Sequence, residues 1–275
     1  MAIIKKAVGQ TTGQAVKKQA PEVNWELPTN YSVPKDALGD YSMLIYGEKK
    51  IGKTTLASHF PDAIFLMFEP GGKALKIYQQ PVRNWREFQK AVALLLQDNR
   101  FQTVVIDTVD IAYELCFDYK CAQLAISHPN DIQDFGSSWR AIRTEFSGQM
   151  NLLQLSGKGI VFLSHAQDVE IKRRGGGSFH KIQATVAKQA LSYLEATVDC
   201  WAFYGYEGSE RRLYIAGDEL VGAGHRIKGR FRTKNDLGIL SIPMGKSSKE
   251  AYDNLVRAFN NEQIEVGETP TRREM

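Results

Sequence analysis

The stretch from Gly47 to Thr54 holds the residues whose types and spacing are best suited to chemistry. It completes the pattern G-x-x-x-x-G-K-[ST], with an apolar run before it and a helix-forming segment after it. In this pattern the glycines let backbone N–H groups turn toward an anion, and the helix that follows adds partial positive charge. The lysine reaches the β- and γ-phosphates, and the threonine hydroxyl holds Mg²⁺. The motif therefore predicts that Lys53 and Thr54 bind ATP and Mg²⁺, a chance match in a loop being the alternative.

Three further polar side chains, Glu69, Asp107 and His165, come directly after apolar runs. Ligands of an open parallel sheet bind beyond the carboxyl ends of its strands, so we expect these side chains near the motif. Asp107 is expected to hold Mg²⁺ with Thr54, or else to cap the next helix. Glu69 is expected to activate water against the γ-phosphate, or else to be a turn carboxylate. His165 is either a γ-phosphate sensor or a structural histidine. The residues expected to contact the nucleotide are Gly47, Glu48, Lys49, Lys50, Ile51, Gly52, Lys53, Thr54, Thr55, Asp107 and His165.

A basic, glycine-rich segment lies further along the chain, between residues 172 and 181. Cations neutralise phosphates and an aromatic face stacks on an exposed base, a combination typical of single-strand binding. The residues expected to contact single-stranded DNA are Lys172, Arg173, Arg174, Phe179 and Lys181. Two other interpretations stay open: a solvated hairpin tip, and a kinase-like lid whose arginines close on phosphates.

A second pair of cations, Lys228 and Arg230, falls in an expected late strand. Cations there can reach the nucleotide of a neighbouring subunit and stabilise charge in the transition state. The alternative is ordinary charge on a solvent-exposed strand. The two residues are therefore candidates for a catalytic role in trans.

Strands without polar alternation, separated by helices, position these residues. We expect strands at 41–46, 63–68, 101–106 and 159–164, helices at 85–97, 111–126 and 138–155, and shorter strands at 198–206, 211–216 and 226–231. Such a pattern predicts an α/β fold with a mainly parallel sheet covered by helices on both faces. The shorter strands are expected to extend the sheet antiparallel at one edge.

The bulk composition limits the remaining possibilities. A chain of 275 residues with 43% hydrophobic content can bury one sizeable core. Its net charge of +4 says little about nucleic acid by itself, and its three cysteines suit a reducing cytoplasm as buried thiols. No apolar run approaches the roughly 20 residues of a membrane span, so we expect a cytoplasmic protein without a membrane partner. The expected organisation is a flexible N-terminal arm (1–35), a core (36–258) and a flexible tail (259–275).

Taken in order, these elements resemble the RecA-like P-loop ATPases encoded by bacteriophages, some of which act as single-strand annealing recombinases. The likeness rests on the motif, on the strands that end at Glu69, Asp107 and His165, and on their order. It implies that Glu69 is catalytic, that Ser164 and His165 couple nucleotide to DNA, and that the basic segment is a DNA-binding loop. RecA-type recombinases more often carry a glutamine-containing pair where this chain has Ser164-His165. A Lys-x-Arg pair in a late strand of related proteins is similar to Lys228-Gly229-Arg230.

The resemblance implies an ATPase, stimulated by DNA, that acts on single-stranded DNA in phage recombination or annealing. Its implied partners are single-stranded DNA, further copies of the chain in a ring or filament, and a single-strand DNA-binding protein; in a host cell it would work in the cytoplasm. Two alternatives remain. One is a P-loop nucleotide or nucleoside kinase, and the other is a nucleotide-gated interaction module of the replication machinery.

Overall fold

The computed structural model describes residues 27–262 of the chain. The chain divides into two compact units, residues 1–34 and residues 35–275. In the first unit, residues 27–34 form neither helix nor strand. The helices and strands described below all belong to the second unit. The predicted arm and tail lie mostly outside the described residues, so the three-part organisation stays a prediction.

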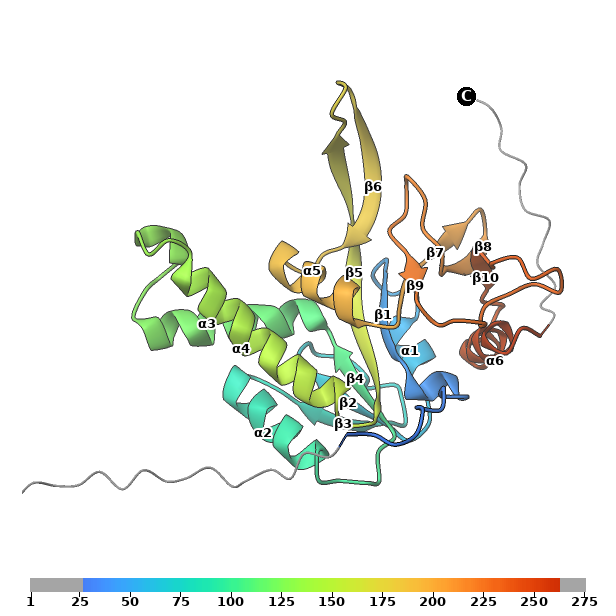
Figure 1. Cartoon of the computed structure of the whole chain (residues 1–275), viewed down its shortest axis with the longest axis horizontal. Helices are drawn as coiled ribbons and strands as arrows, with labels where there is room; N and C mark the ends of the chain where they lie inside the picture. The colour runs from blue at the N-terminus through green and yellow to red at the C-terminus, as the bar shows by residue number, and fades with distance from the viewer. Residues whose placement is uncertain (1–26, 263–275) are drawn as a thin grey trace, which may run out of the picture. The chain divides into compact units, whose positions relative to one another are not determined.

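One ten-stranded sheet forms the centre of the second unit (Figure 1). Its strands are β1 (Ser42–Gly47), β2 (Ala63–Met67), β3 (Tyr78–Pro81), β4 (Thr103–Asp107), β5 (Gly159–Lys172), β6 (Ser178–Ala184), β7 (Cys200–Glu207), β8 (Glu210–Tyr214), β9 (Gly224–His225) and β10 (Ser241–Pro243). Their order is β10-β8-β7-β1-β5-β4-β2-β3, with β6 paired to β5 and β9 paired to β7. The strands from β7 to β3 are parallel, whereas β8 and β10 are antiparallel at one edge.

Helices cover both faces of this sheet, as the sequence pattern predicts. They are α1 (Lys53–Ala57), α2 (Trp85–Leu95), α3 (Val109–Leu124), α4 (Ser137–Gln154), α5 (Lys188–Thr197) and α6 (Ser248–Phe259), with short 3-10 helices η1 (Leu38–Asp40) and η2 (Pro129–Asp131). The core between the sheet and α2, α3, α4 and α5 is one cluster, and the core beneath α1 and α6 is a second. Because both faces are covered, every residue of β1 and β4 is buried.

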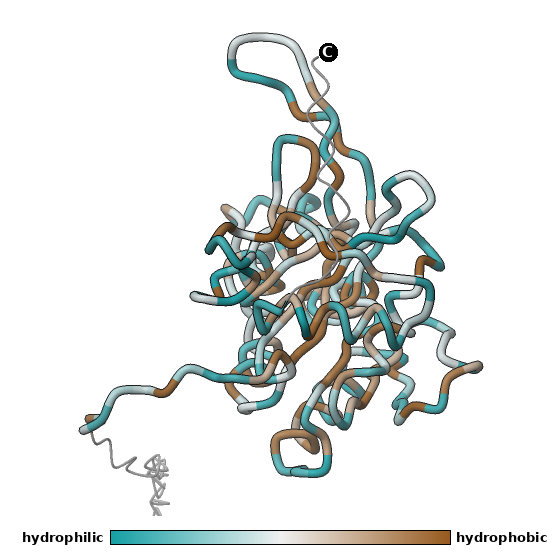
Figure 2. Tube along the Cα trace, turned by 90° about the vertical axis from the view of Figure 1, so that its right-hand side faces the viewer, coloured by the Kyte–Doolittle hydropathy of each residue, from teal (hydrophilic) through white to brown (hydrophobic). Residues whose placement is uncertain are grey.

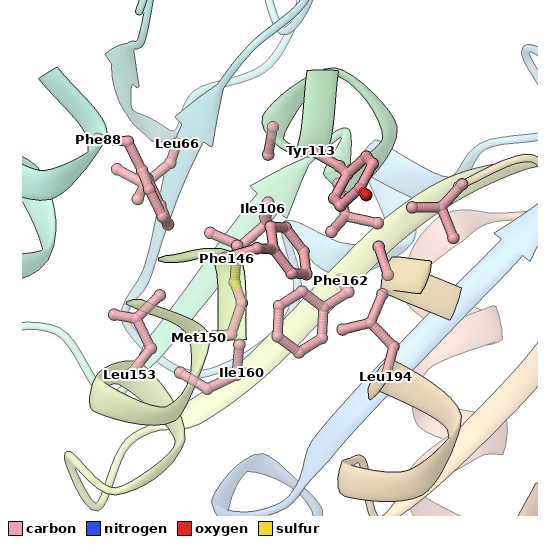
Figure 3. Packing of buried hydrophobic residues seen from close by; sticks show 14 of the residues in the cluster. Leu66, Phe88, Ile106, Tyr113, Phe146, Met150, Leu153, Ile160, Phe162 and Leu194 are labelled. Carbon is pink, nitrogen blue, oxygen red and sulfur yellow. The ribbon is translucent and has the colours of Figure 1, made fainter. Parts of the chain in front are cut away.

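The larger cluster shows how the side chains of α4 pack against those of β4 and β5 (Figure 3). Ile106 of β4 and Phe162 of β5 meet Phe146 and Met150, which recur four residues apart on α4. All four side chains are at most 1% exposed. Burying each such side chain contributes about 1.5–3 kcal/mol, so this packing fixes α4 across the strands that carry Asp107 and His165.

The structure corrects the expected end of one strand. Beyond Ser164, β5 continues to Lys172 and pairs antiparallel with β6, from Ala166 opposite Ala184 to Lys172 opposite Ser178. Exposed and part-buried residues mix in this outer half because no helix covers it. The resulting β5–β6 hairpin projects from the sheet (Figure 1). Hydrophilic and hydrophobic residues mix along the hairpin, and its turn has no strongly hydrophobic residue (Figure 2).

One expectation about the later strands was wrong. Residues 226–231 do not form a strand, because Gly229 and Phe231 have positive φ values of 77° and 57°, which are incompatible with an extended backbone. The predicted antiparallel edge is confirmed at β8 and β10, whereas β7 runs parallel to β1. Six further elements were not predicted from the sequence: β3, β6, β9, β10, α5 and α6. For α6 a signal existed, since Ser247 caps the helix by accepting from the Glu250 N–H at 3.1 Å.

Candidate nucleotide-binding site

Strand pairing brings the four predicted strand ends to one edge of the sheet. Gly47 at the end of β1 lies opposite His165 of β5. Met67 at the end of β2 lies opposite Asp107 of β4, and Glu69 follows two residues later. The structure therefore places the phosphate-binding motif, Glu69, Asp107 and His165 together, at the edge where parallel sheets bind ligands.

The loop from Gly47 to Lys53 has a compact geometry. Gly47 has to be glycine because a Cβ atom there would lie 2.1 Å from the carbonyl oxygen of Tyr204 on β7. The backbone then turns through positive φ values at Lys50 and at Gly52, where φ is 109°. Lys53 is 6% exposed. Its Nζ donates to the carbonyl oxygens of Gly47 and Glu48, both at 2.8 Å, which holds the ammonium group at the mouth of the loop.

Burial sets the charge balance of Lys53. It lowers the lysine pKa to about 8, against the opposing effect of the Asp107, Asp110 and Glu69 carboxylates. Phosphate oxygens at the motif would stabilise the charged form. Lys53 is therefore a group whose protonation is linked to anion binding.

Thr54 and Asp107 contact each other directly. The Thr54 hydroxyl donates to the Asp107 carboxylate at 2.7 Å, and Asp107 is 7% exposed. Burial raises the pKa of Asp107, while the Thr54 hydrogen bond lowers it. A hydroxyl and a carboxylate oxygen side by side are the hard ligands that Mg²⁺ takes from P-loop proteins, so this pair fits the metal.

Glu69 lies across the edge from Lys53, with His165 between them. Glu69 accepts from the Thr108 hydroxyl at 2.6 Å and lies 3.6 Å from His165 Nε2. The other ring nitrogen of His165, Nδ1, is 3.5 Å from Lys53 Nζ. The Glu69 side chain is 37% exposed, so it combines a fixed orientation with access to water. This geometry suits a carboxylate that orients a water molecule.

Sequence reasoning missed two residues, Asp110 and Thr185, that connect this edge to the hairpin. The Asp110 carboxylate accepts from the Ser164 hydroxyl at 3.0 Å and from the Thr185 hydroxyl. Thr185, just beyond β6, also donates its N–H to the His165 carbonyl at 3.0 Å. Burial raises the pKa of Asp110. Asp110 follows Asp107 by three residues, but nothing in the sequence indicates contacts with residues 54 and 75 positions away.

The predicted DNA-binding residues lie on the β5–β6 hairpin, away from the strand ends. Arg173 contacts Glu219 and lies over the ring of Phe179, with its guanidinium carbon 5.2 Å from the ring centroid. Lys172 and Arg174 are exposed, and Lys181 is half-buried midway along β6, opposite Val169. The hairpin also carries carboxylates: Asp168 lies 2.9 Å from His180, and Glu170 accepts from Ser178. Its cations outnumber its carboxylates, which leaves a net positive arm.

Lys228 and Arg230 lie in the loop between β9 and β10 rather than at the strand ends. Arg230 pairs with Asp36 at 3.1 Å, and its guanidinium carbon lies 4.5 Å from the ring centroid of Phe259. Lys228 is exposed. Within this chain neither residue approaches the motif through any contact among residues 27–262, so a role in trans remains a prediction.

Two compositional expectations can also be compared with the structure. Cys116, Cys121 and Cys200 are buried and free, as expected for ordinary core thiols. Between residues 27 and 262 no cluster of three or more His, Cys, Asp or Glu side chains could hold a metal ion. In the same span, no helix is long and apolar enough to cross a membrane.

Comparison with known proteins identifies the family to which the chain belongs. The family model described as "AAA domain" matches residues 40–227. The SPbeta prophage-derived uncharacterized protein YorG of Bacillus subtilis (strain 168) is 27% identical over 143 residues, covering 50% of this chain and 44% of that protein. The chain thus aligns with less than half the length of this relative.

Two solved structures also resemble the chain. The KaiC-like protein PH0186 of Pyrococcus horikoshii OT3 aligns with a TM-score of 0.43 at 12% identity, covering 76% of this chain and 87% of that one. The RadB recombinase aligns with a TM-score of 0.42 at 13% identity, covering 78% and 90%.

The family match spans β1 to the segment after β9, which includes the motif, Glu69, Asp107 and His165. In the sheet, β5 lies between the motif strand β1 and the Asp107 strand β4. The chain therefore belongs to the AAA domain family, and it has a prophage-derived relative.

Proposed function

We propose that this protein binds and hydrolyses ATP at the motif and uses the ATP cycle to act on single-stranded DNA in phage recombination or annealing. The observation that carries the proposal is the course of β5. This one strand passes the nucleotide edge at His165 and continues to Lys172 at the turn of the basic hairpin. A change at the nucleotide edge therefore has a direct path to the hairpin.

Binding would begin with the phosphates. Lys53 already points its ammonium group at the mouth of the loop, where two carbonyl oxygens hold it. Thr54 and Asp107 would hold Mg²⁺, with Asp107 acting directly or through water. When bound, the metal neutralises charge on the β- and γ-phosphates.

Hydrolysis would depend on Glu69. Its carboxylate would accept a hydrogen bond from the attacking water and orient it toward the γ-phosphate. Thr108 acts as a positioning residue, since its hydroxyl donates to Glu69. His165, which lies between Lys53 and Glu69, would respond to the γ-phosphate.

Coupling to DNA would run through the contacts around Asp110. Because Asp110 joins Ser164 on β5 to Thr185 after β6, it ties both strands of the hairpin to the start of α3. α3 in turn follows Asp107 and Thr108 directly. A shift of His165 or Thr108 on ATP binding would thus reach both ends of the hairpin.

DNA would be held by the hairpin, with phosphates at Lys172, Arg173, Arg174 and Lys181 and a base on Phe179. In an assembly of several copies, as a ring or filament in the host cytoplasm, Lys228 and Arg230 would complete the ATP site of a neighbour. Arg230 would have to leave Asp36 to do so, and the Asp36 side chain is 91% exposed. A single-strand DNA-binding protein is a further expected partner.

The test is binding of a labelled single strand, measured by fluorescence anisotropy over a salt series with and without ATP. If the four hairpin cations each meet a phosphate, the log–log slope is about −3, from roughly −0.7 per contact. The tip variant, Lys172→Ala/Arg173→Ala/Arg174→Ala, should flatten the slope to about −1, because one contact remains.

A control removes three exposed cations elsewhere, in Arg83→Ala/Lys90→Ala/Lys246→Ala. This control should keep the wild-type salt slope. If both variants flatten the slope equally, the effect comes from the net charge of the protein and not from the hairpin. No binding at low salt would contradict the DNA part of the proposal. It would favour a kinase with the hairpin as its lid, or a nucleotide-gated interaction module.

A further inference from the structure

Arg211 on β8 lies beside the nucleotide loop, although sequence reasoning gave it no role. Its Nη1 atom is 3.7 Å from the position that a Cβ atom would take on Gly52, the residue before Lys53. The pKa of Tyr204, raised by burial, is lowered in part by the Arg211 charge, so the guanidinium also lies near the strand that packs on Gly47. Arg211 therefore approaches the loop from the side opposite to Asp107, since β7 and β8 flank β1 on one side and β5 and β4 on the other.

The surroundings hold Arg211 in this place without neutralising it. Its carbonyl oxygen accepts from the Met244 N–H at 2.8 Å, and its Nη2 donates to the Gly245 carbonyl at 2.9 Å. No carboxylate within residues 27–262 forms an ion pair with it. A half-buried guanidinium bound by a single neutral carbonyl keeps donors for another partner.

The neighbouring residue Arg212 has a structural role on the same strand. Arg212 points to the other face of β8, as successive strand residues do. It is 7% exposed, pairs with Glu207 at 2.9 Å and donates to the Ser241 hydroxyl at 2.9 Å. Its charge is compensated locally, whereas the charge of Arg211 faces a loop whose sequence binds phosphate.

We propose that Arg211 is a further nucleotide-binding residue, which donates from its guanidinium to the polyphosphate of a nucleotide bound at Gly47–Thr54 in the same chain. The inference rests on the proposed binding of ATP at this motif. It adds a cation from β8 to the one from Lys53, so that the nucleotide is held between the two sides of β1. Arginine suits this position because its planar fork donates to the Gly245 carbonyl and to a phosphate at once.

The experiment compares Arg211→Ala and Arg211→Lys with the control Lys246→Ala, which removes an exposed cation next to Gly245. Dissociation constants are measured for ATP, ADP and tripolyphosphate by displacement of a fluorescent ATP analogue, and thermal unfolding is followed without ligand. Losing one hydrogen bond to a charged group should weaken binding of all three ligands roughly tenfold to a hundredfold in Arg211→Ala. Arg211→Lys should recover part of the loss, and Lys246→Ala should match the wild type.

Each other outcome overturns the inference. Unchanged affinities in Arg211→Ala, beside a wild type that binds ATP, would leave Arg211 as a structural residue. A loss for ATP and ADP but not for tripolyphosphate would move the contact to the nucleoside. If Arg211→Ala lowers the unfolding temperature enough to explain its loss of affinity, and Arg211→Lys does not restore binding, the substitution acts on folding and not on a phosphate contact. A wild type that binds no ATP would instead contradict the proposed function itself.

Discussion

At the scale of single residues, we expect Lys53 to control how the proposed binding of ATP depends on pH. Because burial lowers its pKa to about 8, the group is largely neutral above that pH in the free protein. Phosphates raise the pKa again, so ATP binding in alkaline solution should take up a proton. The sign follows: affinity for ATP falls as pH rises above about 8, by up to tenfold per unit.

Calorimetry in two buffers of different ionisation enthalpy measures this proton uptake. At about pH 9 we expect close to one proton per ATP, and at about pH 6.5 none from Lys53. In Lys53→Arg the cation stays charged, so whatever binding remains should lose the alkaline uptake. Binding without proton uptake at the higher pH would show that Lys53 is charged throughout.

A substitution of Glu69 should change the turnover of ATP but not the affinity for ATP. Glu69→Gln keeps the size of the side chain and the hydrogen bond from Thr108 but removes the negative charge. We expect ATP affinity near that of the wild type and a turnover lower by roughly 10²-fold or more, as general-base help is lost. Steady-state hydrolysis and equilibrium binding measure the two effects. Wild-type turnover in Glu69→Gln would remove Glu69 from the mechanism.

The positioning role of Thr108 predicts a smaller effect. In Thr108→Val the carboxylate remains but loses the hydroxyl that fixes it. Turnover should fall by about tenfold, with ATP affinity unchanged, since a hydrogen bond to a charged carboxylate contributes at least about 1.5 kcal/mol. Thr185→Val is the matched control, because it removes a half-buried hydroxyl from Asp110 rather than from Glu69. It should leave hydrolysis without DNA intact, and equal losses in both variants would point to a general loss of structure.

At the scale of elements, the packing of β1 against β7 explains the first glycine of the motif. A Cβ atom on Gly47 would lie 2.1 Å from the Tyr204 carbonyl, which cannot rotate away. Gly47→Ala should therefore lower the free energy of unfolding by about 1–3 kcal/mol, as overpacking does. Chemical denaturation without nucleotide measures this loss. Gly175→Ala in the turn of the hairpin, where a Cβ atom meets nothing within 4 Å, is the control and should be neutral.

The elements also show what sequence could and could not predict. Buried strands such as β2 and β4 and amphipathic helices such as α2 were predicted nearly to the residue, because their apolar periodicity is local. The site followed, since parallel strands align their carboxyl ends. The length of β5 was missed because pairing with β6, not hydrophobicity, stabilises its outer half. Asp110 and Arg211 were missed because their contacts arise only when distant segments meet.

At the scale of the whole molecule, one strand, β5, joins the proposed ATP site to the basic hairpin. Lys53, Asp107 and Glu69 gather at the edge of the sheet, and β5 connects that edge to the hairpin cations. If this connection is functional, single-stranded DNA on the hairpin alters the geometry around His165 and Glu69. The central claim is therefore that DNA binding changes the rate of ATP hydrolysis.

The measurement that tests this claim most directly is the ATP hydrolysis rate with and without single-stranded DNA, in the wild type and in the tip variant. We predict stimulation by DNA in the wild type and an unstimulated rate in the tip variant, with equal rates for both when DNA is absent. The charge-matched control, with cations removed at residues 83, 90 and 246, should keep the stimulation. Hydrolysis that is indifferent to DNA in the wild type would contradict the account.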